Sequence, residues 1–261
     1  MRASVRVCAG GRAQKLRLMI VREYRSHNNY NLAPASFCRQ VENMFLETRK
    51  HLANKTRIIR VHRSQLRSFQ QVEKIRALFQ DPQYPKHHPN TVVAEYPCSQ
   101  HAKYELVHDA IDKGYFSSTK FIAWIDIGYF RYLTRRRRKF YVVTPPGMDE
   151  SKIAMTEVNR GDMSLFPSDI FRGNLVWVGG GMSVGTRPVF REFVEEYEQS
   201  TERFLSQGLS NTDQQVIYSM FTDINNVAGK TRTKIQTYTW FLDRVDSCWF
   251  YLGYLCYREV D

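Results

Sequence analysis

The stretch FIAWIDIGYF, from Phe121 to Phe130, decides the fold class of this chain. Nine of its ten residues are apolar or glycine, and the exception is Asp126. A continuous apolar run is typical of a strand that a sheet buries on both faces. A carboxylate costs several kcal/mol to bury unless a partner compensates it. We therefore predict that Phe121–Ile125 is an interior strand and that Asp126 stands at its carboxyl end.

The sequence around this stretch alternates between strand-like and helix-like segments. We predict strands at 56–62, 91–97, 120–128 and 174–180, and helices at 65–79, 99–115, 187–205 and 211–221. This alternation predicts an α/β fold, with a mostly parallel central sheet flanked by helices in a single domain. In such sheets ligands bind outside the carboxyl ends of the strands. The position of Asp126 therefore suits a ligand site better than a core.

Composition limits the classes of partner. The chain has 261 residues, is 43% hydrophobic and carries a net charge of +12, which indicates a packed core and anionic partners. No apolar run reaches the roughly 18 residues of a membrane span, so we expect no transmembrane segment. The basic run RRRRK, Arg135 to Lys139, has no nucleic-acid-binding signature beside it, so no nucleic acid is expected as a partner.

Three short segments are candidates for chemistry, and each has two interpretations. Asp126 either caps the following turn or binds a divalent cation on a phosphate–sugar, with Gly128 leaving space beside the backbone. VGGGMSVGT, 178–186, lacks the third glycine of a dinucleotide-binding loop, because position 184 is Val184. It is either a tight turn or a loop whose glycines let a bulky substrate approach the backbone. Asp213 of NTDQQ is either a helix N-cap or a pocket residue that binds the acceptor or acts as a general base.

The order and spacing of six motifs resemble the HtrL/YibB (WlaTC) family, whose members are regarded as glycosyltransferases of surface-polysaccharide gene regions. The motifs are PQYPKHHPN, AKYELVHDAI, FIAWIDIGYFR, NLVWVGGGMSVG, TDQQVIYSMF and WFYLGYLCYRE. The resemblance as a whole covers roughly Arg57 to Arg258. Residues 1–50 are poorly matched, and 51–261 are assigned to one domain that resembles the GT-A (Rossmann-like) glycosyltransferases.

The resemblance implies a nucleotide-sugar bound at the strand ends. It implies that Asp126 holds Mn²⁺ or Mg²⁺ on the diphosphate beside Gly128, and that Lys103 adds positive charge. The residues that it implies for substrate binding are Trp124, Gly179, Gly180, Gly181 and Gln214, and the catalytic residues are Asp213 and Asp126. The acidic motif of such enzymes has a second aspartate where this chain has Gly128, and no histidine follows His108. Asp243 or Asp246 is the candidate substitute ligand.

The leading hypothesis is a glycosyltransferase that moves a sugar from a nucleotide-sugar to a glycan or glycoconjugate acceptor. The alternative is a catalytically inactive GT-A-like module that binds glycans or phosphosugars, and the third is a basic nucleic-acid-binding protein. We predict that Lys103 faces the same cleft as Asp126, against the alternative of an ordinary exposed lysine. The compartment is either the cytoplasm or, if an N-terminal anchor is missing from this chain, the lumen of the secretory pathway.

Overall fold

The computed structural model describes residues 16–19, 43, 46–47, 49–50, 53, 56–59, 61–115, 117–133, 140–222, 231–240 and 247–259. The strands are β1 (Leu16–Met19), β2 (Phe121–Ile125), β3 (Phe140–Val142), β4 (Lys152–Glu157), β5 (Val178–Thr186), β6 (Lys234–Tyr238) and β7 (Tyr257–Glu259). The α-helices are α2 (Arg67–Gln70), α3 (Val72–Gln80), α4 (Glu95–Asp112), α5 (Pro167–Gly173), α6 (Arg187–Ser206), α7 (Asp213–Thr222) and α8 (Tyr251–Cys256). Two short 3₁₀ helices are η2 (Arg63–Gln65) and η4 (Cys248–Phe250).

The central sheet has the strand order β1-β2-β5-β4-β6. β2 pairs with β1 on one side and β5 on the other, which confirms the predicted interior strand Phe121–Ile125. The α/β class is also confirmed, and four of the five strands, β1, β2, β4 and β6, run in the same direction, in agreement with a mostly parallel sheet. β1 and β2 are parallel, as are β4 and β6, whereas β5 runs antiparallel to both of its neighbours. The sheet is therefore mixed, and β1 brings backbone of the 1–50 segment into it.

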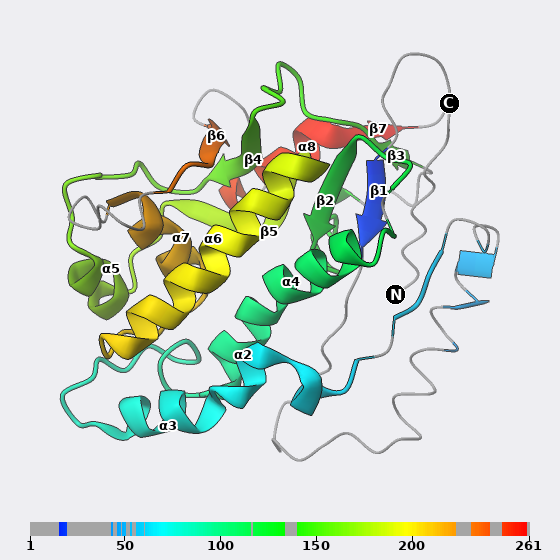
Figure 1. Cartoon of the computed structure of the whole chain (residues 1–261). Coiled ribbons are helices and arrows are strands. Elements are labelled where there is room, and N and C mark those ends of the chain that lie inside the picture. The colour runs from blue at the N-terminus through cyan, green and yellow to red at the C-terminus, as the bar shows by residue number, and fades with distance from the viewer. Residues whose placement is uncertain are drawn as a thin grey trace.

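Two apolar layers explain why β2 is buried throughout. Ile122 and Trp124 pack into a large cluster with the helices, whereas Phe121, Ala123 and Ile125 pack into a second cluster that includes residues of α8. Figure 1 shows α4 and α6 lying together across the sheet, with α8 at its other side. The apolar run thus indicated burial on two faces, which a mixed sheet provides as well as a parallel one.

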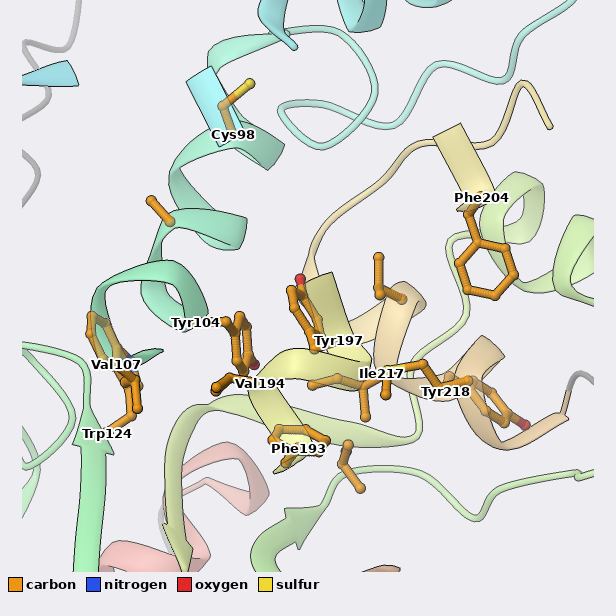
Figure 2. Packing of buried hydrophobic residues seen from close by; sticks show 14 of the residues in the cluster. Cys98, Tyr104, Val107, Trp124, Phe193, Val194, Tyr197, Phe204, Ile217 and Tyr218 are labelled. Atoms are coloured by element: carbon orange, nitrogen blue, oxygen red, sulfur yellow. The ribbon is translucent and has the colours of Figure 1, made fainter. Parts of the chain in front are cut away.

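Helices α4 and α6 are locked together by aromatic side chains (Figure 2). The ring of Tyr104 on α4 stacks on that of Tyr197 on α6, with centroids 3.8 Å apart. Phe193 of α6 meets the edge of Tyr104 at 6.0 Å. Stacked and edge-on aromatic pairs of this kind stabilise a core by about 0.5–1.5 kcal/mol beyond the area that they bury. They hold the part of α4 that carries Lys103, the neighbour of Tyr104.

Two predicted strands are absent from the described residues. At 56–62 the described residues form no strand before η2, and Ile59 and Val61 are exposed. At 91–97 a turn leads into α4, so the helix begins at Glu95 and Ser99 lies inside it rather than capping it. Pro97 is compatible with this start because the first helical turn needs no donor from it. The β-branched residues of both segments favoured strands, but neither segment reaches a partner strand.

The remaining helices lie close to their predicted places. The helix predicted at 65–79 appears as α2 and α3, and those at 187–205 and 211–221 appear as α6 and α7. The glycine segment differs more: 178–186 is the whole of β5 rather than a loop between a strand and a helix. The register between β4 and β5 shifts along the glycines, between the pairs of Met155 and Glu157. No helix within the described ranges is both long and apolar enough to cross a membrane.

Candidate functional site

Asp126 stands where β2 ends and the chain turns away. Its N–H donates to the carbonyl of Gly181 at 2.8 Å, and its own carbonyl accepts from Tyr129 at 2.8 Å. The indole N–H of Trp124 donates to Oδ1 at 2.7 Å. The side chain is 44% exposed, and no described residue donates a hydrogen bond to Oδ2. The end of β2 therefore presents a fixed carboxylate with one oxygen available.

The ammonium of Lys103 lies between two carboxylates. Its Nζ is 2.8 Å from Oδ2 of Asp213 and 3.9 Å from Oδ1 of Asp126. It also donates to the carbonyl of Gly180 at 3.2 Å. Lys103 therefore points toward Asp126, and with 8% of its side chain exposed it is not an ordinary surface lysine.

Burial and the charges of this cluster shift the pKa values of Lys103 and Asp126. Burial alone lowers the pKa of Lys103, but the carboxylates of Asp213 and Asp126 outweigh it and raise the pKa above the usual value. Burial raises the pKa of Asp126, against the lowering effects of Lys103 and the Trp124 hydrogen bond. When all three groups are ionised, two carboxylates share one ammonium. The cluster therefore favours an additional positive charge beside Asp126.

Asp213 is the first residue of α7, and within the described residues its carboxylate accepts no hydrogen bond from the backbone of that helix. Its Oδ2 accepts from Lys103 and from the hydroxyl of Tyr104, which is 3.2 Å away. Both donors come from α4, so this carboxylate ties α7 to α4. Only 2% of its side chain is exposed. Asp213 thus belongs to the predicted site, but as a buried partner of Lys103.

The glycines of β5 let these side chains reach the sheet backbone. A Cβ on Gly180 would lie 2.0 Å from Oδ2 of Asp213, a distance that no real pair of atoms shows. A Cβ on Gly181 would lie 2.8 Å from the ring of Tyr129 and 3.6 Å from Oδ2 of Asp126. Asp213 therefore packs against Gly180, but with 2% of its side chain exposed it does not line a pocket there. The groups that approach the backbone, however, belong to the protein itself.

Two other predicted residues have different surroundings. Gly128 is covered by the side chain of Arg131, three residues further along the chain. A Cβ on Gly128 would be 3.1 Å from the guanidinium of Arg131, and Nε of that guanidinium donates to the Gly128 carbonyl at 2.8 Å. Gln214 is half-buried on α7, and no bond joins it to the cluster within the described residues. Gly128 therefore accommodates Arg131, and Gln214 contributes no contact to this cluster.

Sequence reasoning found Trp124, whose indole is buried and bonded to Asp126, but missed two other aromatic residues of the site, Tyr104 and Tyr129. Tyr104 follows Lys103 directly in AKYELVHDAI, and its hydroxyl donates to Asp213. Tyr129 is three residues after Asp126 and lies between Gly181 and Gly253, whose added Cβ atoms would meet the ring at 2.8 and 2.6 Å. Glycines recurring in VGGGMSVG and WFYLGY are the sequence signal of these close approaches. Asp243, Asp246 and the run at 135–139 lie outside the described residues.

The described residues contain no group of three or more His, Cys, Asp and Glu side chains that could hold a metal ion. Asp126 offers one available oxygen, whereas Asp213 is occupied by Lys103 and Tyr104. This donor set fits a cation that a ligand holds mainly through its own oxygens and water, as Mg²⁺ is commonly bound. It does not provide a cage for a resident metal.

Comparisons with known proteins identify the family. A search of the curated proteins found no match to this chain. The family model described as "Bacterial protein of unknown function (HtrL_YibB)" matches residues 39–241, which is more than half of the chain. The matched range includes Lys103, Asp126, the β5 glycines and Asp213. The chain therefore belongs to the HtrL_YibB family.

Proposed function

We propose that this protein is a glycosyltransferase that moves a sugar from a nucleotide-sugar to a glycan or glycoconjugate acceptor, on a GT-A-like domain. The observation that carries the proposal is the half-exposed carboxylate of Asp126 at the carboxyl end of an interior strand, next to the buried Lys103–Asp213 pair. Strand ends of α/β sheets are where such ligands bind. A diphosphate is a ligand that these charges suit once a cation accompanies it.

In this proposal the three charged residues have different roles. Asp126 faces the diphosphate and its accompanying Mn²⁺ or Mg²⁺ through Oδ2, while the Trp124 N–H fixes Oδ1. Asp213 is a positioning residue, because it holds the ammonium of Lys103 at 2.8 Å and is itself shielded from solvent. Lys103 in turn stands 3.9 Å from Asp126 and limits the negative charge there. The cation, when bound, neutralises charge on the departing diphosphate.

The test replaces Asp126 with Asn, which keeps the size and removes the charge. Because the folded-state pKa of Asp126 is raised, its ionised form opposes folding at neutral pH. Asp126→Asn should therefore not lower the melting temperature at pH 7. It should abolish the Mn²⁺-dependent thermal stabilisation by nucleotide-sugars that we expect for the parent.

The matched control is Asp109→Asn. Asp109 is on α4, is exposed and pairs only at the surface with Lys113 at 2.8 Å. Surface pairs of this kind contribute about 0–1 kcal/mol, so the control should bind as the parent does. Unchanged metal-dependent binding by Asp126→Asn would refute the role given to this carboxylate.

One observation favours the inactive binding module as the second candidate. Asp213, predicted as a general base, is 2% exposed and is already engaged by Lys103 and Tyr104. A carboxylate held in this way is not available to take a proton from an acceptor hydroxyl. Binding of a nucleoside diphosphate with neither hydrolysis nor transfer of the sugar would identify the protein as a binding module.

A further inference from the structure

The closing motif WFYLGYLCYRE packs directly against the turn that follows Asp126. The ring of Tyr129 meets the edge of the Phe250 ring, with centroids 5.2 Å apart. It also lies against Gly253 of α8, where an added Cβ would be 2.6 Å from the ring. The N–H of Leu252 donates to the hydroxyl of Thr156 on β4 at 2.8 Å. These contacts fix η4 and the start of α8 next to the candidate site.

Trp249 of η4 lies on the same glycine segment as the charged cluster. A Cβ on Gly179 would lie 3.7 Å from Cε3 of its indole and 3.7 Å from its carbonyl oxygen. Two residues along an extended chain span about 6.6 Å, so Gly179 brings Trp249 close to Gly181, whose added Cβ would lie 3.6 Å from Oδ2 of Asp126. Trp249 and Asp126 therefore lie near the two ends of the three-glycine segment 179–181.

The indole of Trp249 is left partly open. The residue is 38% exposed, although neighbouring Phe250 and Tyr251 are more covered. No hydrogen bond of its N–H is present within the described part of the chain. Trp is a residue whose apolar face and single donor usually both find partners when it lies at a binding surface. A partly exposed indole with an available donor, on the same glycine segment as a carboxylate with an available acceptor oxygen, suits a ring with an apolar face and a rim of hydroxyls.

We propose that Trp249 is the platform on which a pyranose ring of the substrate stacks, with its hydroxyls within reach of Asp126. The choice of a sugar as ligand rests on the proposed function. The ring belongs either to the nucleotide-sugar or to the saccharide acceptor. A donor sugar and an acceptor sugar can each present a face of C–H groups to the indole. The experiment below distinguishes the donor from the acceptor.

The experiment compares the parent with Trp249→Ala and Trp249→Phe. Calorimetry measures the affinities for UDP-glucose, UDP-galactose and GDP-mannose, and for UDP and GDP alone, with Mn²⁺ present. Saturation-transfer NMR measures binding of the corresponding methyl glycosides. Loss of one aromatic contact should weaken sugar binding about three- to tenfold in Trp249→Ala. Trp249→Phe, which keeps an aromatic face, should retain most of the affinity.

The matched control is Phe166→Ala, which removes an aromatic side chain that is 61% exposed at the start of α5. It should leave every affinity unchanged. A selective loss for nucleotide-sugars in Trp249→Ala assigns the stacked ring to the donor, and a selective loss for methyl glycosides assigns it to the acceptor.

Three results would overturn the platform. They are equal weakening of UDP and UDP-sugars, no change for any ligand, and a parent that binds none of the probes. Methyl glycosides that bind through Trp249, in a parent that binds no nucleotide-sugar, would support the platform and refute the glycosyltransferase.

Discussion

Gly180→Ala tests whether the carboxylate of Asp213 really lies on the backbone of β5. The new Cβ would lie 2.0 Å from Oδ2 and 2.9 Å from Cγ of Asp213. That carboxylate is unable to move aside cheaply, because Lys103 and Tyr104 both hold Oδ2. Overpacking alone costs about 1–3 kcal/mol, and breaking a buried ion pair costs about 3–5 kcal/mol. We expect Gly180→Ala to lower the free energy of unfolding by about 3–5 kcal/mol.

The assay is unfolding by urea and by heat. For a protein of this size each kcal/mol shifts the melting temperature by about 2–4 °C, so we expect a decrease of about 6–20 °C. Gly179→Ala is the matched control on the same strand, where the nearest side-chain atom is Cγ2 of Val158 at 3.3 Å. That contact requires a small shift only, and a Gly to Ala change also restricts the unfolded chain, so the control should stay within about 1 kcal/mol of the parent.

A double-mutant cycle gives the decisive result. In an Asp213→Ala background the atoms that clash are gone, so Gly180→Ala should then cost less than about 1 kcal/mol. If Gly180→Ala is as stable as Gly179→Ala, or if its cost is the same with and without the Asp213 carboxylate, the reasoning is refuted.

Three further predictions concern the buried charges. Lys103→Met should cost about 3–5 kcal/mol at pH 7, because it leaves Asp213 without its cation. The folded-state pKa of Lys103 is raised above 10.5, so the stability that its charge adds is complete below pH 10.5 and is lost as the pH rises through the raised pKa. Urea unfolding at increasing pH should therefore show the difference in free energy of unfolding between parent and Lys103→Met becoming smaller. A constant difference would contradict this prediction. Asp213→Asn should also destabilise, unlike Asp126→Asn, and equal melting temperatures for these two variants would contradict the burial difference. Burial lowers the pKa of His101 from 6.5 to about 4. The preference of the folded state for neutral His101 therefore contributes about 3 kcal/mol to the free energy of unfolding above pH 6.5, and this contribution is lost as the pH falls toward 4. Urea unfolding at pH 7 and 4.5 should show this loss in the parent and not in His101→Gln.

The elements predicted best were those whose signal is local. The apolar run of β2 and the helical spacing of α6 each fix burial through the residues of one segment, and both elements lie where the sequence predicts them. The segment at 91–97 shows the opposite case. Its β-branched residues favour a strand, but a strand forms only with a hydrogen-bonded partner, and here a turn and α4 take that place. The reversal of β5 was not predicted, because burial on two faces does not encode the direction of a strand relative to its neighbours.

In the candidate site, too, local features were predictable from the sequence, whereas contacts between distant segments were not. The sequence by itself determined that Asp126 ends an apolar strand, that residues 179–181 are glycines without side chains, and that Lys103 and Asp213 lie on helices. Only the tertiary structure decided that Asp213 is paired with Lys103 rather than free as a base, and that Gly180 makes room for it. The same holds for Trp249, which is far from Asp126 in the sequence and reaches the site because Tyr129 packs between Gly181 and Gly253. Pairing energies depend on distances of a few ångströms between elements that the chain brings together only on folding.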